Sequence, residues 1–172
     1  PQAIDYLVKV LEDREQDPIV RHEAAEALGA IGKPEVLEIL EKYKTDSAVE
    51  VAETCQIAFE RVKWLNSTEQ NTEKLTESLY LSVDPAPPST CTDISELEDI
   101  LFDEEKPLFE RYRAMFSLRN IKSQRAVLIL SHALSFGSAL FRHEVAFVLG
   151  QLQDENSVPF LMDSLRNSFE HE

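Results

Sequence analysis

The sequence predicts an all-α protein, an α-solenoid in which helical hairpins stack in two arms joined by a proline-rich linker. Apolar residues recur at the i, i+3, i+4 and i+7 spacing of amphipathic helices. The chain has only four glycines in 172 residues. One segment is written twice, since RHEAAEALGAIG at 21–32 returns as RHEVAFVLGQLQ at 142–153. Repeated helical units that each bury an apolar stripe against the next unit are typical of a solenoid.

The hydrophobic periodicity places helices along most of the chain. Proline in the first turn marks several helix starts, at Asp17-Pro18, Lys33-Pro34 and Lys106-Pro107. The expected helices cover residues 4–12, 19–31, 34–43 and 48–64, and then 94–102, 108–121, 124–134, 139–152 and 157–169.

The repeat extends beyond the two most similar copies. Aligning Arg21, Arg111 and Arg142 gives RHEAAEALGAI, RYRAMFSLRNI and RHEVAFVLGQL, each with Leu at the eighth position. EVAETCQIAFE, which begins at Glu50, is a weaker fourth copy. Neighbouring copies start about thirty residues apart, which is the length of one helical hairpin.

A segment of different composition separates the two halves. Residues 66–93 are rich in Ser, Thr, Pro and acids, and the run Asp84-Pro85-Ala86-Pro87-Pro88 should be stiff because proline fixes φ. We therefore expect an N-terminal arm at 1–65, a linker at 66–93 and a C-terminal arm at 94–172.

The composition restricts the classes of partner. The formal net charge of -15, from 32 acids and 17 bases, disfavours nucleic acid and anionic membranes. It favours a basic protein or a polycationic ligand, or it serves solubility alone. No long apolar run and no secretory signal is visible, which predicts a cytoplasmic protein. Cys55 and Cys91 lack a C-x-x-C spacing and are expected to be ordinary free thiols.

The RHE copies carry the candidate chemistry. On a helical wheel with Ala24 at zero, His22 falls near about 160° and Glu26 near about 200°, away from a predicted packing stripe. That stripe contains Val20, Ala24, Ala27, Leu28 and Ile31, and in the second copy Phe141, Val145, Val148, Leu149 and Leu152. A histidine beside a carboxylate, as in His22-Glu23 and His143-Glu144, is a pairing found in iron, manganese and zinc sites. Two other interpretations remain open: a buried histidine with a satisfied hydrogen bond, or a solvated pair near a helix start.

Other features of the two copies admit more than one interpretation. Gly29 and Gly150 each cost a helix about 1 kcal/mol relative to alanine, so they make room either for a ligand or for a facing helix. Arg21 and Arg142 either steady a carboxylate or serve the structure. One His-Glu pair per arm cannot fill a metal's coordination sphere, but two arms together supply more donors. The terminal His171-Glu172 pair lacks the preceding arginine.

Several stretches resemble one known family. VRHEAAEALGAIGKPEVLEIL, VEVAETCQ, YLSVDPAPP, PLFERYRAMFSLRN and GSALFRHEV are similar to deoxyhypusine hydroxylase, a HEAT-repeat di-iron monooxygenase. The resemblance implies two arms of HEAT-like hairpin repeats, with two Fe2+ ions held by His22, Glu23, His143 and Glu144. It also implies that O2 is used to hydroxylate the deoxyhypusine side chain of translation factor 5A. Glu26, whose counterpart in the second copy is Phe147, is the candidate to bind the cationic substrate.

The chain departs from the family in one respect. The family carries four His-Glu motifs, and this chain shows those that correspond to the second and third. The chain begins at Pro1 without Met, so we expect a truncated core that is inactive alone and that could self-associate to restore ligands. The main alternative function is a non-enzymatic HEAT scaffold for a basic protein partner. A further alternative is a HEAT-like lyase that acts on a tetrapyrrole.

Overall fold

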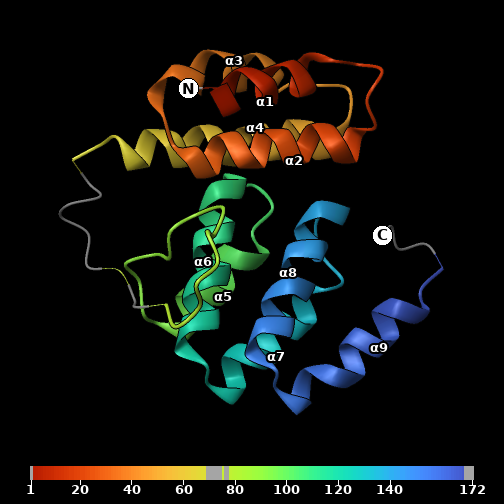
Figure 1. The fold of residues 1–172 in the computed structure, drawn as a ribbon. Helices are drawn as coiled ribbons and strands as arrows, with labels where there is room; N and C mark the ends of the chain where they lie inside the picture. The colour runs from red at the N-terminus through yellow and green to blue at the C-terminus, as the bar shows by residue number, and fades with distance from the viewer. Residues whose placement is uncertain (1, 69–74, 76–77, 169–172) are drawn as a thin grey trace. The chain divides into compact units, whose positions relative to one another are not determined.

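The computed structural model describes residues 2–68, 75 and 78–168, and within them the secondary structure is entirely helical. The described residues fall into two compact units. One contains residues 2–68 and 83–87, and the other contains residues 75, 78–82 and 88–168. The predicted all-α solenoid of hairpin repeats is confirmed (Figure 1). The expected domain limits, 1–65, 66–93 and 94–172, stay a prediction.

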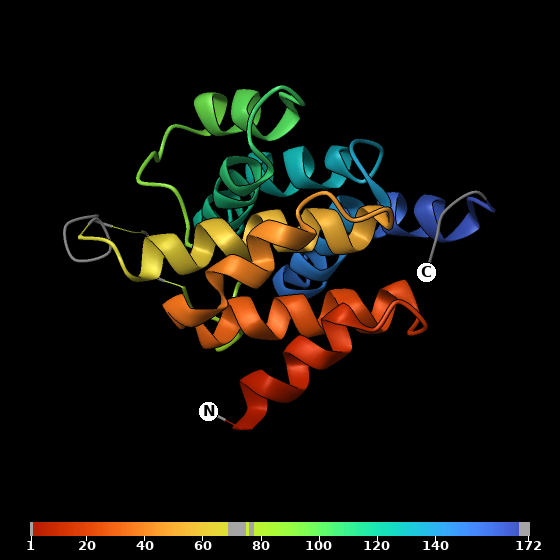
Figure 2. The ribbon, with the colours of Figure 1, turned by 90° about the horizontal axis from the view of Figure 1, so that it is seen from above.

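The N-terminal unit is built from two helical hairpins. The first comprises α1 (Gln2–Glu12) and α2 (Pro18–Ile31). The second comprises the 3-10 turn η1 (Pro34–Val36), α3 (Leu37–Tyr43) and α4 (Val49–Leu65). Helices α2 and α4 run alongside each other, while α1 covers α2 and α3 covers α4 (Figures 1 and 2). The core between these layers is formed by residues that include Ile4, Leu11, Ala25, Leu28, Leu40, Val51 and Val62.

The C-terminal unit repeats this two-layer plan. Its helices are α5 (Ile94–Phe102), α6 (Leu108–Ile121), α7 (Gln124–Ala133), α8 (Ala139–Leu152) and α9 (Val158–Arg166), with the 3-10 turn η3 (Glu155–Ser157) before α9. Within the unit, α6 packs beside α8 and α5 packs beside α7, as Figure 1 shows. Its fully buried side chains include Leu97, Leu101, Tyr112, Phe116, Leu130, Phe141 and Val145.

The helix ends follow from local capping chemistry. Asp17 accepts a hydrogen bond from the Ile19 amide at the start of α2, and Pro18 occupies the first helical position. Gly32 ends α2 with φ of 70°, a left-handed conformation that favours glycine. The predicted helix boundaries agree with the observed ones to within one or two residues where both are described. The predicted helix at 34–43 differs because its first turn is a 3-10 turn. The predicted helix at 157–169 is too long, since α9 spans Val158–Arg166 and Ser157 belongs to a 3-10 turn; residue 169 lies outside the described residues.

The predicted packing stripe of α2 is wrong in part. Val20 and Ile31, expected inside it, remain 44% and 40% exposed. Arg21, Ala25 and Gly29 are buried instead, so the buried face is turned by about 70° toward His22. The helical wheel located the packing stripe from the large apolar residues of α2. In the structure, small residues determine which face of α2 a neighbouring backbone can approach. In α8 the stripe is largely confirmed, since four of its five residues are buried: Phe141, Val145, Val148 and Leu149.

The two repeated glycines have different surroundings. A Cβ added at Gly29 would lie 2.7 Å from the Cβ of Ala58 and 3.0 Å from its Cα, so this glycine permits the close approach of α2 and α4. A Cβ at Gly150 would meet no atom within 4 Å among the described residues. Close helix packing therefore explains Gly29, and no contact in the described part of the chain explains Gly150.

A buried arginine joins the helices of a hairpin. The Arg21 Nε donates to the carbonyl oxygen of Leu11 at 3.0 Å, and its terminal nitrogens bind both carboxylate oxygens of Asp46 at 3.2 and 2.6 Å. The Arg111 Nε donates in the same way to the carbonyl oxygen of Leu101 at 3.0 Å. These arginines satisfy carbonyl groups that a helix C-terminus leaves without helical partners. The structural interpretation of Arg21 is therefore confirmed.

The connection between α4 and α5 makes specific contacts with both units. In the C-terminal unit, the Arg119 guanidinium lies 4.8 Å from the Tyr80 ring centroid, and the Ser89 amide donates to the Arg113 carbonyl at 3.2 Å. In the N-terminal unit, the Arg61 Nε donates to the Asp84 carbonyl at 3.0 Å. Ala86 and Pro87 are buried. These contacts order the proline-rich segment, while its predicted stiffness stays a prediction.

Neither cysteine forms a disulfide, as predicted: Cys55 is buried and Cys91 is partly exposed. In the part of the chain that the structure describes, no helix is both long and apolar enough to span a membrane.

Substituting Gly29→Ala should destabilise the N-terminal unit, because the new methyl group must push α2 away from Ala58. Overpacking of this kind costs about 1–3 kcal/mol, which exceeds the gain of about 1 kcal/mol in helix propensity. The matched control Gly150→Ala meets no neighbour among the described residues and should stabilise the protein by about 0.5–1 kcal/mol. Urea unfolding followed by circular dichroism measures both. Equal effects in the two variants would contradict this account of Gly29.

Substituting Asp46→Asn should destabilise the fold by about 3 kcal/mol at neutral pH, because it leaves the buried Arg21 without its counter-ion. The hydrogen bonds from Arg21 lower the pKa of Asp46 below its usual value. A lowered carboxyl pKa contributes stability above the unfolded-state pKa of about 4, and this is lost as the pH falls through the folded-state pKa. The wild-type protein should therefore lose more stability on acidification below about pH 4 than the variant does. Unfolding free energies measured across this range test the prediction.

The control for this measurement is Glu12→Gln. It removes the exposed ion pair between Lys42 and Glu12, whose atoms lie 3.1 Å apart, and should leave stability nearly unchanged. An acid-induced loss in Asp46→Asn as large as that of the wild type would show that another carboxylate is responsible.

Candidate functional site

The first His-Glu pair lies in the second turn of α2. The N-terminal cap at Asp17 fixes where the helix begins, and the buried Arg21 fixes how it is rotated. His22 is therefore presented at the border of the packed face, with 12% of its side chain exposed, whereas Glu23 is 68% exposed. The expectation that His22 points away from the packed face is wrong, because that face is turned toward it.

Both ring nitrogens of His22 have a polar neighbour. Nδ1 lies 3.4 Å from the Thr54 hydroxyl on α4, and Nε2 lies 3.5 Å from Oε1 of Glu23. Two donors that bind one first-row metal ion at about 2.1 Å from adjacent positions are themselves about 3–3.5 Å apart. The separation of Nε2 and Oε1 therefore suits two donors to one ion, and a neutral imidazole with a carboxylate is a donor set that iron accepts.

The second pair, on α8, has a different environment. Ser138 caps this helix by accepting a hydrogen bond from the Phe141 amide at 3.2 Å. His143 is exposed and Glu144 is partly buried. The same Arg-His-Glu pattern thus has one histidine near a packed face and the other open to solvent.

Glu26 lies one helical turn after His22 on α2 and is partly buried. Its role in substrate binding stays a prediction. The His171-Glu172 pair lies outside the described residues.

The metal prediction is not completed by the described residues. Within residues 2–68, 75 and 78–168, no group of three or more His, Cys, Asp or Glu side chains could hold a metal ion. The described residues therefore bring together two candidate donors, His22 and Glu23, and no group of three. The roles of His22, Glu23, His143 and Glu144 as ligands stay a prediction.

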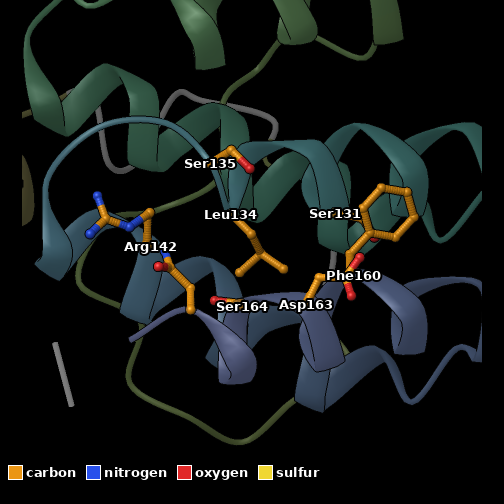
Figure 3. A pocket seen from close by; sticks show the side chains of 8 residues that line it. Ser131, Leu134, Ser135, Arg142, Phe160, Asp163 and Ser164 are labelled. Carbon is orange, nitrogen blue, oxygen red and sulfur yellow. The ribbon is translucent and has the colours of Figure 1, made fainter. Parts of the chain in front are cut away.

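A groove of about 510 Å³ in the C-terminal unit involves a different part of the second repeat (Figure 3). Its lining includes Leu134 just after α7, Arg142 of α8, and Phe160 and Asp163 of α9, but neither His143 nor Glu144. Arg142 donates to the Gly137 carbonyl at 2.6 Å. This arginine therefore serves local structure and is not shown beside the candidate ligands.

Arg142 can be compared directly with Arg21. Asp46, which pairs with Arg21, follows it by 25 residues. The residue that follows Arg142 by the same interval is Asn167, which also lines the groove. The groove thus lies where the first repeat places its buried ion pair, which indicates a feature of repeat packing.

Thr54 is the neighbour of the candidate site that the sequence did not reveal. It lies within the weak repeat copy EVAETCQIAFE, and nothing in the sequence relates that position to His22. The two residues meet only because α2 and α4 pack against each other. The adjacent Cys55 is not a candidate nucleophile, since burial raises the pKa of its thiol to about 12 and keeps it protonated at neutral pH.

Two models of HEAT-type repeats match separate parts of the chain. Residues 1–60 match a family model described as HEAT repeats. Residues 110–136 and 141–167 match a model described as PBS lyase HEAT-like repeat. The repeats found in the sequence are therefore HEAT repeats.

The chain also matches curated proteins along almost its whole length. It is 56% identical to the deoxyhypusine hydroxylase of Drosophila melanogaster, covering 99% of this chain and 56% of that protein. It is 55% identical to the deoxyhypusine hydroxylase of Gallus gallus, covering 98% of this chain and 56% of that protein. The chain thus spans about half the length of the curated relatives it matches.

A solved structure of human deoxyhypusine hydroxylase in complex with glycerol has the same fold. The TM-score is 0.90 at 55% identity, and the match covers 99% of this chain and 58% of the human one. The chain therefore belongs to the HEAT-repeat proteins, and along almost its whole length it is similar to deoxyhypusine hydroxylases, about half of whose length it spans.

Proposed function

We propose that this chain is part of an iron-dependent monooxygenase that hydroxylates the deoxyhypusine side chain of translation factor 5A to hypusine, in the cytoplasm. The observation that carries the proposal is the His22-Glu23 pair, in which two donor atoms 3.5 Å apart suit a single metal ion. The identity of about 55% to deoxyhypusine hydroxylases over the whole chain supports it. The activity for which these relatives are named is thus proposed for a chain that covers about half of their length.

The proposed metal ligands are His22, Glu23, His143 and Glu144. Two Fe2+ ions, when bound, would supply the activation of O2. The residues of this chain contribute neutral imidazole nitrogens and carboxylate oxygens, which are suitable donors for iron. Since the described residues offer no group of three donors, we propose that the chain alone does not hold both irons in a full ligand set.

Recognition of the substrate is proposed to rest on charge. The chain carries a formal net charge of -15, and the deoxyhypusine side chain is a long cation derived from a polyamine. Glu26 lies one turn from His22, so its carboxylate could pair with an ammonium group of a substrate bound near that histidine. The acidic surface would also accelerate association with a basic partner.

The rival function is a HEAT scaffold that binds a basic protein without catalysis. The observation that favours it is the lack of a three-donor group among the described residues. Iron content and oxygen transfer distinguish the two functions, because a scaffold needs neither.

The hydroxylase proposal predicts oxygen transfer to a defined substrate. A version of the protein extended to the length of its relatives should add one oxygen atom to deoxyhypusine-containing factor 5A in the presence of Fe2+ and O2. The 172-residue chain alone should add none, because its described residues contain no group of three donors for a metal ion. Mass spectrometry of the factor measures the product. An extended protein that binds the factor but contains no iron and transfers no oxygen would support the scaffold instead.

The ligand assignment predicts that His22→Ala and His143→Ala each lower the iron content of the extended protein while leaving its helicity intact. The matched control is His132→Ala, because His132 is exposed on α7, packs edge-on against Phe160 and belongs to no His-Glu pair. Elemental analysis and circular dichroism of the three variants provide the measurement. If His22→Ala or His143→Ala unfolds the protein instead, the interpretation of a buried structural histidine is correct.

A further inference from the structure

We propose that Thr54 is a positioning residue for His22, whose hydroxyl holds Nδ1 of the imidazole so that Nε2 faces the Glu23 carboxylate. The inference rests on the proposed function for its purpose, which is to present Nε2 to a metal ion. The contact itself does not depend on that function. Thr54 Oγ1 lies 3.4 Å from Nδ1, and Glu23 Oε1 lies 3.5 Å from Nε2.

Thr54 is well placed to fix a neighbouring ring. It is 6% exposed and lies on α4, where it faces α2. One turn later on the same helix, Ala58 makes the tight approach to Gly29 that sets the spacing of α2 and α4. The hydroxyl is therefore held by packed backbone, and its β-branched side chain has restricted χ1 freedom. A partner fixed in this way restricts the imidazole more than a mobile surface side chain would.

The chemistry of a hydroxyl suits the two proton arrangements of a neutral imidazole. A threonine hydroxyl both donates and accepts hydrogen bonds. With the proton on Nε2, that N–H faces the Glu23 carboxylate and the hydroxyl of Thr54 donates to Nδ1. With the proton on Nδ1, that N–H donates to Thr54, and the lone pair of Nε2 is free to bind a metal ion. Thr54 can thus form a hydrogen bond with Nδ1 in both tautomers of the neutral ring.

Partners of this kind tune metal-bound histidines. The second ring nitrogen of a ligating histidine usually bonds to a fixed polar group, and loss of that group typically weakens metal binding or activity by about 10–100-fold. Thr54→Val keeps the shape of the side chain and removes the hydroxyl, whereas Thr54→Ser keeps the hydroxyl. Comparing these two variants separates the effect of the hydroxyl group on the imidazole from the effect of the side chain on packing.

The first experiment uses the 172-residue chain without metal, at a pH where imidazole is neutral. Ring 15N spectra of His22 should be alike in the wild type and in Thr54→Ser. In Thr54→Val the two ring nitrogen shifts should change, because the ring exchanges between orientations and tautomers. The control Thr45→Val, at an exposed threonine of the same unit, should leave the spectrum unchanged. Unchanged His22 shifts in Thr54→Val would overturn the proposal, whatever happens to stability.

The second experiment measures Fe2+ affinity in the extended protein. Thr54→Val should weaken binding by about tenfold or more, and Thr54→Ser should bind nearly as the wild type does. If the ring spectrum changes but Fe2+ affinity does not, the role toward the metal is overturned. If the wild type binds no Fe2+, the proposed function fails while the ring measurement still decides the positioning of His22.

Discussion

The close approach of α2 and α4 is the constraint on which the N-terminal unit depends. Gly29 leaves no side chain between its helix and Ala58, so the two backbones come nearer than a pair of ordinary residues would allow. At that spacing Arg21 reaches Asp46 in the turn between α3 and α4, and His22 reaches Thr54. One small residue therefore sets both the buried ion pair that stabilises the repeat and the surroundings of the candidate ligand.

Charge inside the repeat serves a backbone requirement. The last carbonyl groups of α1 and α5 have no partners within their own helices, and burying them unpaired would be costly. Arg21 and Arg111 each reach back ten residues to such a carbonyl, at the same distance of 3.0 Å. Their charges are then stabilised differently, by the Asp46 carboxylate in one hairpin and by the Phe141 ring at 4.3 Å in the other. The shared arginine follows from hairpin geometry, and its counterpart varies with the neighbouring helix.

The two RHE copies have similar sequences but lie in different environments. His22 has a polar neighbour on each ring nitrogen, whereas His143 is exposed on α8. A side chain at Gly29 would collide with the facing helix α4, whereas a Cβ at Gly150 would meet no atom within 4 Å in the described part of the chain. The sequence of a repeat determines which face of its helix carries each residue. The repeat packed against it determines which residues that face contacts.

The sequence by itself determined the helical hairpins, their order and nearly all of their limits, because amphipathic periodicity and capping residues act over a few positions. It also singled out His22-Glu23 and His143-Glu144 as candidate donor pairs, because the repeat returned them in register. It could not assign the buried face of α2, where small residues that permit backbone contact outweigh Val20 and Ile31. Only the tertiary structure showed that Thr54, 32 residues from His22, lies against its ring. Contacts between repeats depend on how closely two helices approach, and that distance results from all the side chains between them.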